Sequence, residues 1–418
     1  MKEDTKILKE DAKVLRKLAW EYFKIAFSDR NFENIKLHKA VNDLKMIRPV
    51  VLIDELPWSE MNINDELTLQ CTDKYLQHIE WFLRSNIYKN KYLPADMVVP
   101  PFIPVSKVIR STGIGISVEE EVLATDEKNN IKSHKYIDVL KTEADLEKLH
   151  NEEIVYDEEE TMRRYQLVGD ILGDIIPVKL MGIPYFTVVT WDDIARYRGV
   201  TNLLIDLVER PEFMHKIVRK LTDIKLSTLE QLEALNLLDI NGYVLHCTPI
   251  YTGDLPSKDY DGTKVTRKDV WGRGAAQIFG TVSKEMHEEF DIEYMKETIG
   301  QCGLAYYGCC EPLDKKIDIV EKIPNLRKIS ITPWADVNVA AEAINTKYVL
   351  SAKPNPAAVA TSSLNEENVR EELGKILSAC KRYNCSCDIV LKDISTCHKR
   401  PQNIFRWQEI AMEMVKNF

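Results

Sequence analysis

The chain alternates between short apolar, β-branched runs and longer amphipathic segments, and this alternation constrains its fold more than any other feature. Strands that alternate with helices form right-handed βαβ units and a parallel sheet. Eight such units close most simply into a single distorted (β/α)8 TIM barrel, which is the α/β architecture that we expect here. The expected strands cover residues 49–55, 97–103, 176–182, 242–247, 303–309, 327–332, 347–352 and 387–393.

An open, doubly wound sheet is the alternative to the barrel. It predicts a glycine-rich phosphate-binding turn after the first strand. The first expected strand instead continues into Glu55, Leu56, Pro57 and Trp58. The barrel is therefore favoured, and residues 1–418 are treated as one domain.

Two segments are expected to lie outside the barrel. Residues 1–48 form an N-terminal helical extension, because apolar residues recur at near 3.6 spacing over residues 6–28. Residues 111–160 interrupt the alternation between the second and third strands, with a hairpin around a turn at 126–130 and a short helix. This insertion is either a solvated decoration or a lid or docking surface.

Charge and composition exclude several classes of protein. The net charge is −10, from 56 basic and 66 acidic residues, without a basic face that would bind nucleic acid. No run reaches the roughly 20 apolar residues of a membrane span, and the charged N-terminus lacks a secretory signal. We therefore expect a cytoplasmic chain with reduced cysteines. The GxSxG, HExxH and P-loop patterns are absent from the sequence.

Catalytic groups of such barrels lie at the carboxyl ends of the strands. Zinc favours thiolate and imidazole ligands, and a catalytic zinc site leaves one position open for substrate. The thiols and the imidazole at these ends therefore indicate a metal site on one rim, with coincident burial of unrelated cysteines as the alternative. The side chains at the strand ends are Glu55, Trp58, His246, Cys247, Tyr306, Tyr307, Cys309, Cys310, Glu311, Trp334, Asp393 and Cys397.

Several segments, in their order and spacing, resemble one known superfamily. They are RGVTNLL at 198–204, ERPE at 209–212, SKEMHEEF at 283–290, the fifth strand end, and LSAKPNP at 350–356. With these segments the chain resembles the uroporphyrinogen decarboxylase superfamily over nearly its whole length. Members of that superfamily form single distorted (β/α)8 barrels and are often dimers, so the resemblance leaves a homodimer open.

The resemblance favours one branch of this superfamily over the other. True porphyrin decarboxylases carry an N-terminal arginine-rich loop and an aspartate over the tetrapyrrole centre. Here residues 52–58 supply acids instead of arginines, and Pro100, Pro101 and Phe102 stand where the aspartate is expected. A tetrapyrrole with eight carboxylates would be repelled. The chain is therefore more similar to the branch of zinc-dependent, corrinoid-linked methyltransferases.

That branch implies a set of zinc ligands, which this chain matches in part. Its members use a His-x-Cys at the fifth strand and a cysteine after the eighth. Cys397 matches the cysteine after the eighth strand, and Cys310 or Cys309 matches the cysteine at the fifth. Tyr307 or Gly308 stands in the place of the histidine.

We hypothesise that other side chains replace the missing histidine. His246 on the expected fourth strand would supply the nitrogen, and Glu311 an oxygen. With this ligand set, zinc should be lost on Cys397→Ser. Glu55 or Asp393 would donate a proton to the leaving group.

The resemblance also implies an activity. It implies a methyltransferase that moves a methyl group between a small O-, N- or S-methyl compound and a corrinoid protein, with the help of bound zinc. A metal-free lyase or decarboxylase acting on a non-porphyrin substrate, and a non-catalytic binding barrel, are the alternatives. Four aromatic side chains are expected to wall the substrate, although plain packing is the other interpretation; they are Trp58, Tyr306, Tyr307 and Trp334.

Overall fold

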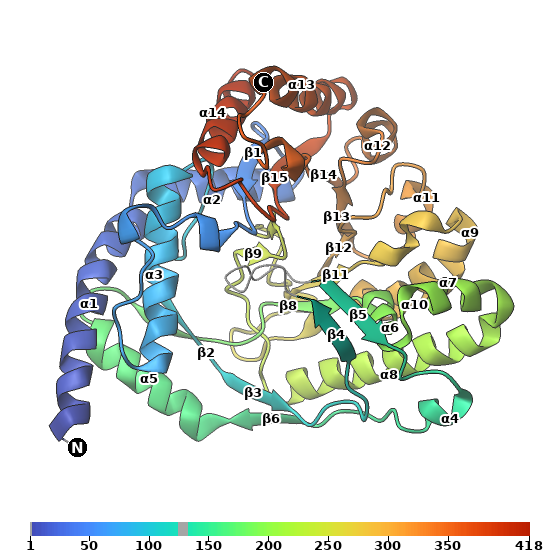
Figure 1. The fold of residues 1–418 in the computed structure, drawn as a ribbon, viewed down its shortest axis with the longest axis horizontal. Helices are drawn as coiled ribbons and strands as arrows, with labels where there is room; N and C mark the ends of the chain where they lie inside the picture. Colours follow the sequence, from blue (N-terminus) through green and yellow to red (C-terminus); the bar gives the residue numbers. More distant parts are fainter. Residues whose placement is uncertain (1, 124–132) are drawn as a thin grey trace.

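The computed structural model describes residues 2–123 and 133–418, so the expected turn at 126–130 lies outside the described residues. Its centre is a seven-stranded parallel sheet that curves around the middle of the molecule (Figure 1). In spatial order the strands are β1 (Val50–Ile53), β15 (Ser386–Leu391), β14 (Val349–Ala352), β13 (Leu326–Ile331), β12 (Leu304–Tyr307), β11 (Trp271–Gly274) and β8 (Tyr185–Val188).

Helices surround this sheet on its outer side (Figure 1). No helix in the part of the chain that the structure describes is long and apolar enough to cross a membrane. The helices are α1 (Lys2–Ala26), α2 (Asp29–Asn42), α3 (Lys74–Tyr92), α4 (Glu143–Leu146), α5 (Glu158–Leu172), α6 (Thr190–Arg198), α7 (Val200–Glu209), α8 (Pro211–Ala234), α9 (Lys284–His287), α10 (Glu293–Glu297), α11 (Ile317–Val320), α12 (Val337–Ile344), α13 (Glu366–Tyr383) and α14 (Gln402–Lys416).

Helix α13 illustrates how the local sequence sets these elements. The Asn365 side chain caps its first turn by accepting from the Asn368 amide, and acidic residues at its start and basic residues at its end suit the helix dipole. Asn384, with φ of 55°, ends the helix in the left-handed conformation. The buried side chains recur at helical spacing and form one face; they are Val369, Leu373, Ile376, Leu377, Ala379 and Cys380.

The third expected strand, at 176–182, is present, whereas the second, at 97–103, is misplaced: residues 97–102 are loop and the strand begins at residue 103. The two strands form a separate parallel pair. This pair is β2 (Ile103–Ser106) with β7 (Val178–Met181). Within the described residues, no ladder joins the pair to the seven-stranded sheet. The architecture is therefore mixed α/β with a parallel sheet, and closure into an eight-stranded barrel stays a prediction.

The expectation of a fourth parallel strand at 242–247 is wrong. There β9 (Val244–Leu245) pairs antiparallel with β10 (Thr248–Pro249), and β11 takes the place between β8 and β12. The sequence of β11 hides it because two of its four residues are glycines. A Cβ on Gly272 would meet Ile299 at 2.8 Å, and one on Gly274 would meet Met295 at 2.7 Å, so a neighbouring turn packs directly on this strand.

The β9–β10 hairpin lies inside the curve of the sheet (Figure 1), where buried polar groups hold it. The Lys328 ammonium on β13 donates to the Asp388 carboxylate at 2.7 Å, to the Thr248 hydroxyl at 3.0 Å and to the Pro249 carbonyl at 2.8 Å. Ser351 on β14 donates to Asp388 at 2.5 Å. These strand positions point inward, where a barrel is ordinarily filled by aliphatic side chains. The hairpin therefore takes the place of part of the core.

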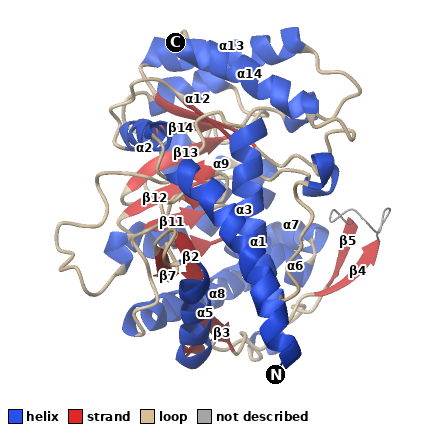
Figure 2. Ribbon diagram, turned by 90° about the vertical axis from the view of Figure 1, so that its left-hand side faces the viewer, coloured by secondary structure: helices blue, strands red, loops and turns tan. Residues whose placement is uncertain are grey.

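The segment 111–160 contains two antiparallel pairs and the short helix α4. Strand β3 (Val108–Ser111) pairs with β6 (Ile154–Asp157), and β4 (Glu119–Leu123) pairs with β5 (Ser133–Ile137). The β4–β5 pair projects from the side of the molecule (Figure 2). Arg198 anchors the chain just after β5 by pairing with Asp138 and, at 2.8 Å, with Asp206.

A buried histidine on α2 predicts how stability depends on pH. His38 donates from Nε2 to the Asp96 carbonyl at 2.8 Å, and burial lowers its pKa to about 4. The unfolded chain takes up this proton near its ordinary pKa of about 6.5, so the folded state should lose up to about 1.4 kcal/mol per pH unit as pH falls from about 6.5 to about 4. His38→Gln keeps an N–H donor without a titrating group. The free energy of unfolding, measured with urea, should therefore fall less steeply with falling pH in His38→Gln than in the wild type. Equal slopes would contradict the lowered pKa of His38.

Candidate functional site

The carboxyl ends of the parallel strands bring polar side chains to one edge of the sheet. Glu55 follows β1, Cys309 follows β12, Trp334 follows β13, Lys353 follows β14 and Lys392 follows β15. Because these strands run parallel, their ends lie together, as the sequence predicted. The site is built from these ends and from the tip of the β9–β10 hairpin.

The tip of the hairpin is a strained two-residue loop. Thr248 pairs with Leu245, so His246 and Cys247 alone connect the two strands. Their φ angles are 27° and 61°, a conformation that such loops usually give to Asn-Gly. A residue other than glycine costs roughly 1–2 kcal/mol there. Conformations of this kind persist where the surrounding structure holds them, and they cluster at functional sites.

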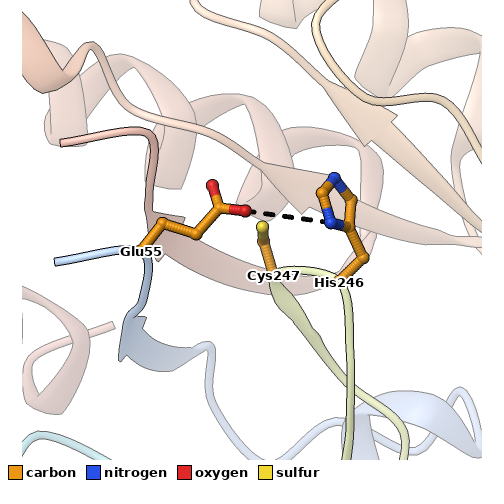
Figure 3. A group of neighbouring side chains, drawn as sticks. All are labelled: Glu55, His246 and Cys247. Carbon is orange, nitrogen blue, oxygen red and sulfur yellow. Dashed lines mark ion pairs between the residues drawn. The ribbon is translucent and has the colours of Figure 1, made fainter. Parts of the chain in front are cut away.

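The hairpin tip faces the end of β1 and makes a group of three potential metal ligands. The ligand atoms of Glu55, His246 and Cys247 lie within 4.8 Å of one another, and the three side chains point toward a common centre (Figure 3). Glu55 Oε1 is 3.8 Å from His246 Nδ1. Ligands of one tetrahedral zinc ion lie about 3.3–3.8 Å apart, so small side-chain rotations would suffice. Three donors of these kinds fit zinc and leave its fourth position open.

The surroundings of two of these groups favour their protonated forms, which a bound metal would oppose. Burial, together with Glu55, raises the pKa of the Cys247 thiol. Burial also raises the pKa of Glu55, and the neighbouring Asp393 adds to the effect. Burial by itself raises the pKa of Asp393, but hydrogen bonds from Glu55 and Lys392 keep it below its ordinary value. Of the two carboxyls, Glu55 is therefore the better proton donor, and metal binding at this group should release protons.

A reactive thiolate lies on the other side of the imidazole. Cys309 Sγ is 3.4 Å from His246 Nε2, 3.3 Å from Lys392 Nζ and 3.6 Å from Cys310 Sγ. The thiol of Cys310, His246 and Lys392 lower the pKa of Cys309 to about 3, although burial opposes this. Cys309 in turn raises the pKa of Cys310, so Cys310 keeps its proton. Lys392 also donates to Asp393 at 2.6 Å.

A pocket of about 420 Å³ opens beside this thiolate. Its charged and thiol groups come from the strand ends, and its other walls are formed by proline, alanine and Trp334, with Thr332, Asn355 and Ser395 among them; Trp334 is 71% exposed. The pocket therefore combines an apolar wall with a reactive floor. The lining residues are Cys309, Cys310, Thr332, Pro333, Trp334, Lys353, Pro354, Asn355, Pro356, Ala357, Ala360, Lys392, Asp393 and Ser395.

Only one of the five expected metal ligands, His246, belongs to this group. Cys309 and Cys310 line the pocket instead, and Cys397 and Glu311 have other partners. The Cys397 thiol and amide both bond to Glu60, at 3.2 Å and 2.9 Å. The buried Glu311 carboxylate accepts from the amides of Ala276 at 3.1 Å and Cys309 at 3.0 Å. Both side chains are thus engaged outside the Glu55, His246 and Cys247 group.

The expected aromatic wall divides in the same way. Trp334 lines the pocket, whereas Trp58 packs edge-on against Trp81 with ring centroids 5.1 Å apart. Successive residues of β12 face opposite sides. Tyr306 packs toward the hairpin, and Tyr307 donates to Asp291 at 2.5 Å on the helical side. Tyr306 and Tyr307 are therefore packing residues.

Sequence reasoning left out three side chains that matter here. Cys247 was named at the end of the fourth expected strand but was given no ligand role, whereas in the observed turn its side chain and that of His246 reach the same group. Lys353 and Lys392 are buried lysines at the ends of β14 and β15. A lysine that ends an otherwise apolar strand was the signal for both.

Comparison with known proteins adds a likeness of shape. No family model matches the chain, and no curated protein matches it by sequence. Among solved structures, a methyltransferase from Methanosarcina mazei is similar, with 10% identity and a TM-score of 0.44. The match covers 90% of this chain and 97% of that chain. At this level the likeness says nothing of the chain's activity.

Proposed function

We propose that the chain is a zinc-dependent methyltransferase whose metal is held by Glu55, His246 and Cys247. The observation that carries the proposal is the hairpin tip, which places an imidazole and a thiol beside a carboxylate in a backbone conformation unfavourable to both residues. A chain that needed only a turn would have Asn-Gly there. All three donors are of types that zinc binds, and three protein ligands leave a fourth position open, as in catalytic zinc sites.

The neighbouring side chains suit methyl transfer. When bound, zinc would supply a Lewis acid for the heteroatom that carries the methyl group. The apolar wall around Trp334 would hold a small methyl compound and exclude water. His246 and Lys392 keep Cys309 ionised, so that a second sulfur faces the pocket. Asp393 also faces the pocket, where its hydrogen bond from Lys392 favours the ionised carboxylate.

The proposed substrate and partner protein follow from the resemblance of the sequence to the corrinoid-linked methyltransferases. The substrate would be a small O-, N- or S-methyl compound, and the other methyl partner would be a corrinoid protein docked at the rim of an eight-stranded barrel. The exposed Trp334 at the mouth of the pocket is consistent with a partner that covers it. The metal-free lyase is separated from this proposal by chelation, because a lyase would keep its full turnover.

Metal analysis of two cysteine variants tests the ligand set. Protein purified without added metal should hold about one zinc per chain. Cys247→Ser should lose it, because it removes a donor of the three-residue group. Cys397→Ser should retain it, because Cys397 bonds to Glu60.

Inductively coupled plasma mass spectrometry on both variants, with circular dichroism to confirm folding, gives the result. Zinc lost from Cys397→Ser and kept by Cys247→Ser would restore the ligand set implied by the resemblance. Wild-type protein without zinc, cobalt or iron, and unable to take up zinc, would overturn the metal site. Methyl transfer to a corrinoid protein should be lost in Cys247→Ser and after chelation.

A further inference from the structure

Cys309 and Cys310 are adjacent in sequence, and their sulfur atoms are 3.6 Å apart. Cys309 is buried, whereas Cys310 is exposed, and both line the pocket. We propose that this pair is a modification site, at which a hydroperoxide entering the pocket forms a reversible disulfide between the two residues.

The surroundings of the pair suit both steps of this reaction. Lys392 Nζ lies 3.3 Å from the Cys309 sulfur and 3.5 Å from the Cys310 sulfur, and His246 Nε2 lies 3.4 Å from Cys309. These donors stabilise negative charge on Cys309, the form that attacks a peroxide. The Asp393 carboxylate is 3.5 Å from the Cys310 sulfur and is placed to accept its proton.

The reaction balances with the hydroperoxide as the oxidant. The Cys309 sulfur attacks one peroxide oxygen, the O–O bond breaks, and the departing oxygen leaves as an alcohol, or as water from hydrogen peroxide, after taking a proton. The sulfenic acid on Cys309 is then attacked by Cys310, which gives its proton to Asp393. The S–S bond forms, the S–O bond breaks, and the hydroxide leaves as water with that proton. Two thiols and one hydroperoxide thus give one disulfide, one alcohol and one water.

The spacing of the backbone indicates that the disulfide is easily reduced. Consecutive Cα atoms lie about 3.8 Å apart, whereas ordinary disulfides join Cα atoms about 4.4–6.8 Å apart. The bond would therefore be strained, and strained disulfides are the labile ones. Reversal by a small dithiol is expected.

Other thiols of the chain serve as internal controls. Cys380, Cys385 and Cys387 lie near one another in sequence but are fully buried in the core around α13 and β15. They line no part of the pocket beside Cys309. A peroxide should therefore reach the pair at 309–310 first.

The disulfide needs neither metal nor methyl substrate, so it is independent of the proposed function. Its effect on activity rests on that function, because oxidation removes the Cys309 thiolate from beside His246. A failure of methyl transfer would leave the disulfide untouched, and a failure of the disulfide would leave the metal site untouched. The two proposals are tested by separate readouts.

Mass spectrometry of the full-length protein, stripped of metal by a chelator, tests the proposal. The protein is treated with a small excess of hydrogen peroxide, and its free thiols are then alkylated. The peptide that contains Cys309 and Cys310 should carry no alkyl group and should be lighter than the reduced, unalkylated peptide by two hydrogen atoms. Dithiothreitol should restore both alkylation sites. Cys380, Cys385 and Cys387 should be alkylated throughout after denaturation.

Cys310→Ser provides the matched variant, since it removes the resolving thiol and leaves Cys309 in place. It should accumulate sulfenic acid at Cys309, trapped by dimedone, on the order of tenfold above wild type. Cys380→Ser should behave as wild type. The proposal is overturned if wild-type Cys309 and Cys310 stay alkylatable under peroxide, if wild-type Cys309 proceeds to sulfinic acid beside a free Cys310, or if the oxidised cysteines join two chains on a non-reducing gel.

Discussion

Replacing His246 by Asn together with Cys247 by Gly should abolish zinc binding and, in the same protein, raise its stability. Both positions have positive φ, and Asn-Gly is the pair that such a hairpin loop favours. Relief of the backbone strain at the positive-φ positions should add about 1–2 kcal/mol to the free energy of unfolding. Removal of the buried Cys247 thiol should subtract a smaller amount. Zinc titration against a chromophoric chelator and urea unfolding in the presence of a chelator measure the two effects.

The control for this variant is His246→Ala with Cys247→Ala. It removes the same two ligands but keeps a Cβ at both positive-φ positions, so it should lose zinc without gaining stability. Equal destabilisation of both double variants would show that the loop is unstrained. Zinc retained by the Asn-Gly variant would show that the metal lies elsewhere. The expected result would show that the wild-type chain is less stable than it could be because the two metal ligands require this loop conformation.

Lys328→Met should destabilise the protein by about 3–5 kcal/mol, the usual cost of removing one member of a buried ion pair. Lys328 and Asp388 are both fully buried and 2.7 Å apart. The substitution leaves the carboxylate with Ser351 as its close partner and withdraws two hydrogen bonds from the hairpin at Thr248 and Pro249. Chemical denaturation gives the free energy, and the zinc affinity of the variant should also fall because the hairpin tip loses its support.

A second substitution separates charge from packing. Lys328→Met combined with Asp388→Leu removes both charges, and it should recover part of the lost stability, since replacing a whole buried pair is often nearly neutral. A loss below about 1 kcal/mol in Lys328→Met alone would mean that water reaches Asp388. A double variant no better than the single would mean that the hydrogen bonds to the hairpin matter more than the ion pair.

The strands that the sequence predicted well are those whose apolar runs are buried in the sheet. The expected strand at 347–352 corresponds to Val349–Ala352, and that at 387–393 to Ser386–Leu391. The fourth strand was missed because Gly272 and Gly274 carry no side chains that could reveal it. The hairpin was taken for a strand of the sheet because Val244 and Leu245 are apolar. A segment that packs inside a sheet and a strand that belongs to the sheet both have apolar residues, so their sequences look alike.

The sequence predicted where the candidate site lies better than it predicted which side chains contact one another there. Glu55, Cys309 and Asp393 lie together because parallel strands bring their ends to one edge, and His246 reaches them from the tip of the hairpin. The role given to Cys397 depended on the resemblance, and Glu60 occupies that thiol instead. Pairings of this kind depend on loop conformations, which short-range patterns do not encode.

The enclosed hairpin also has a consequence for the order in which the chain folds. Thr248 bonds to Ser351 and Asp388, which follow it by 103 and 140 residues, and Asn42 bonds to Pro249 across 207 residues. Five of the seven strands of the sheet, β11 to β15, are therefore made after the hairpin during synthesis, and they must close around a segment already present. Contacts between such distant parts of a chain form slowly. Glu55 and the hairpin tip come together only when this enclosure is complete, so metal capture would mark the end of folding.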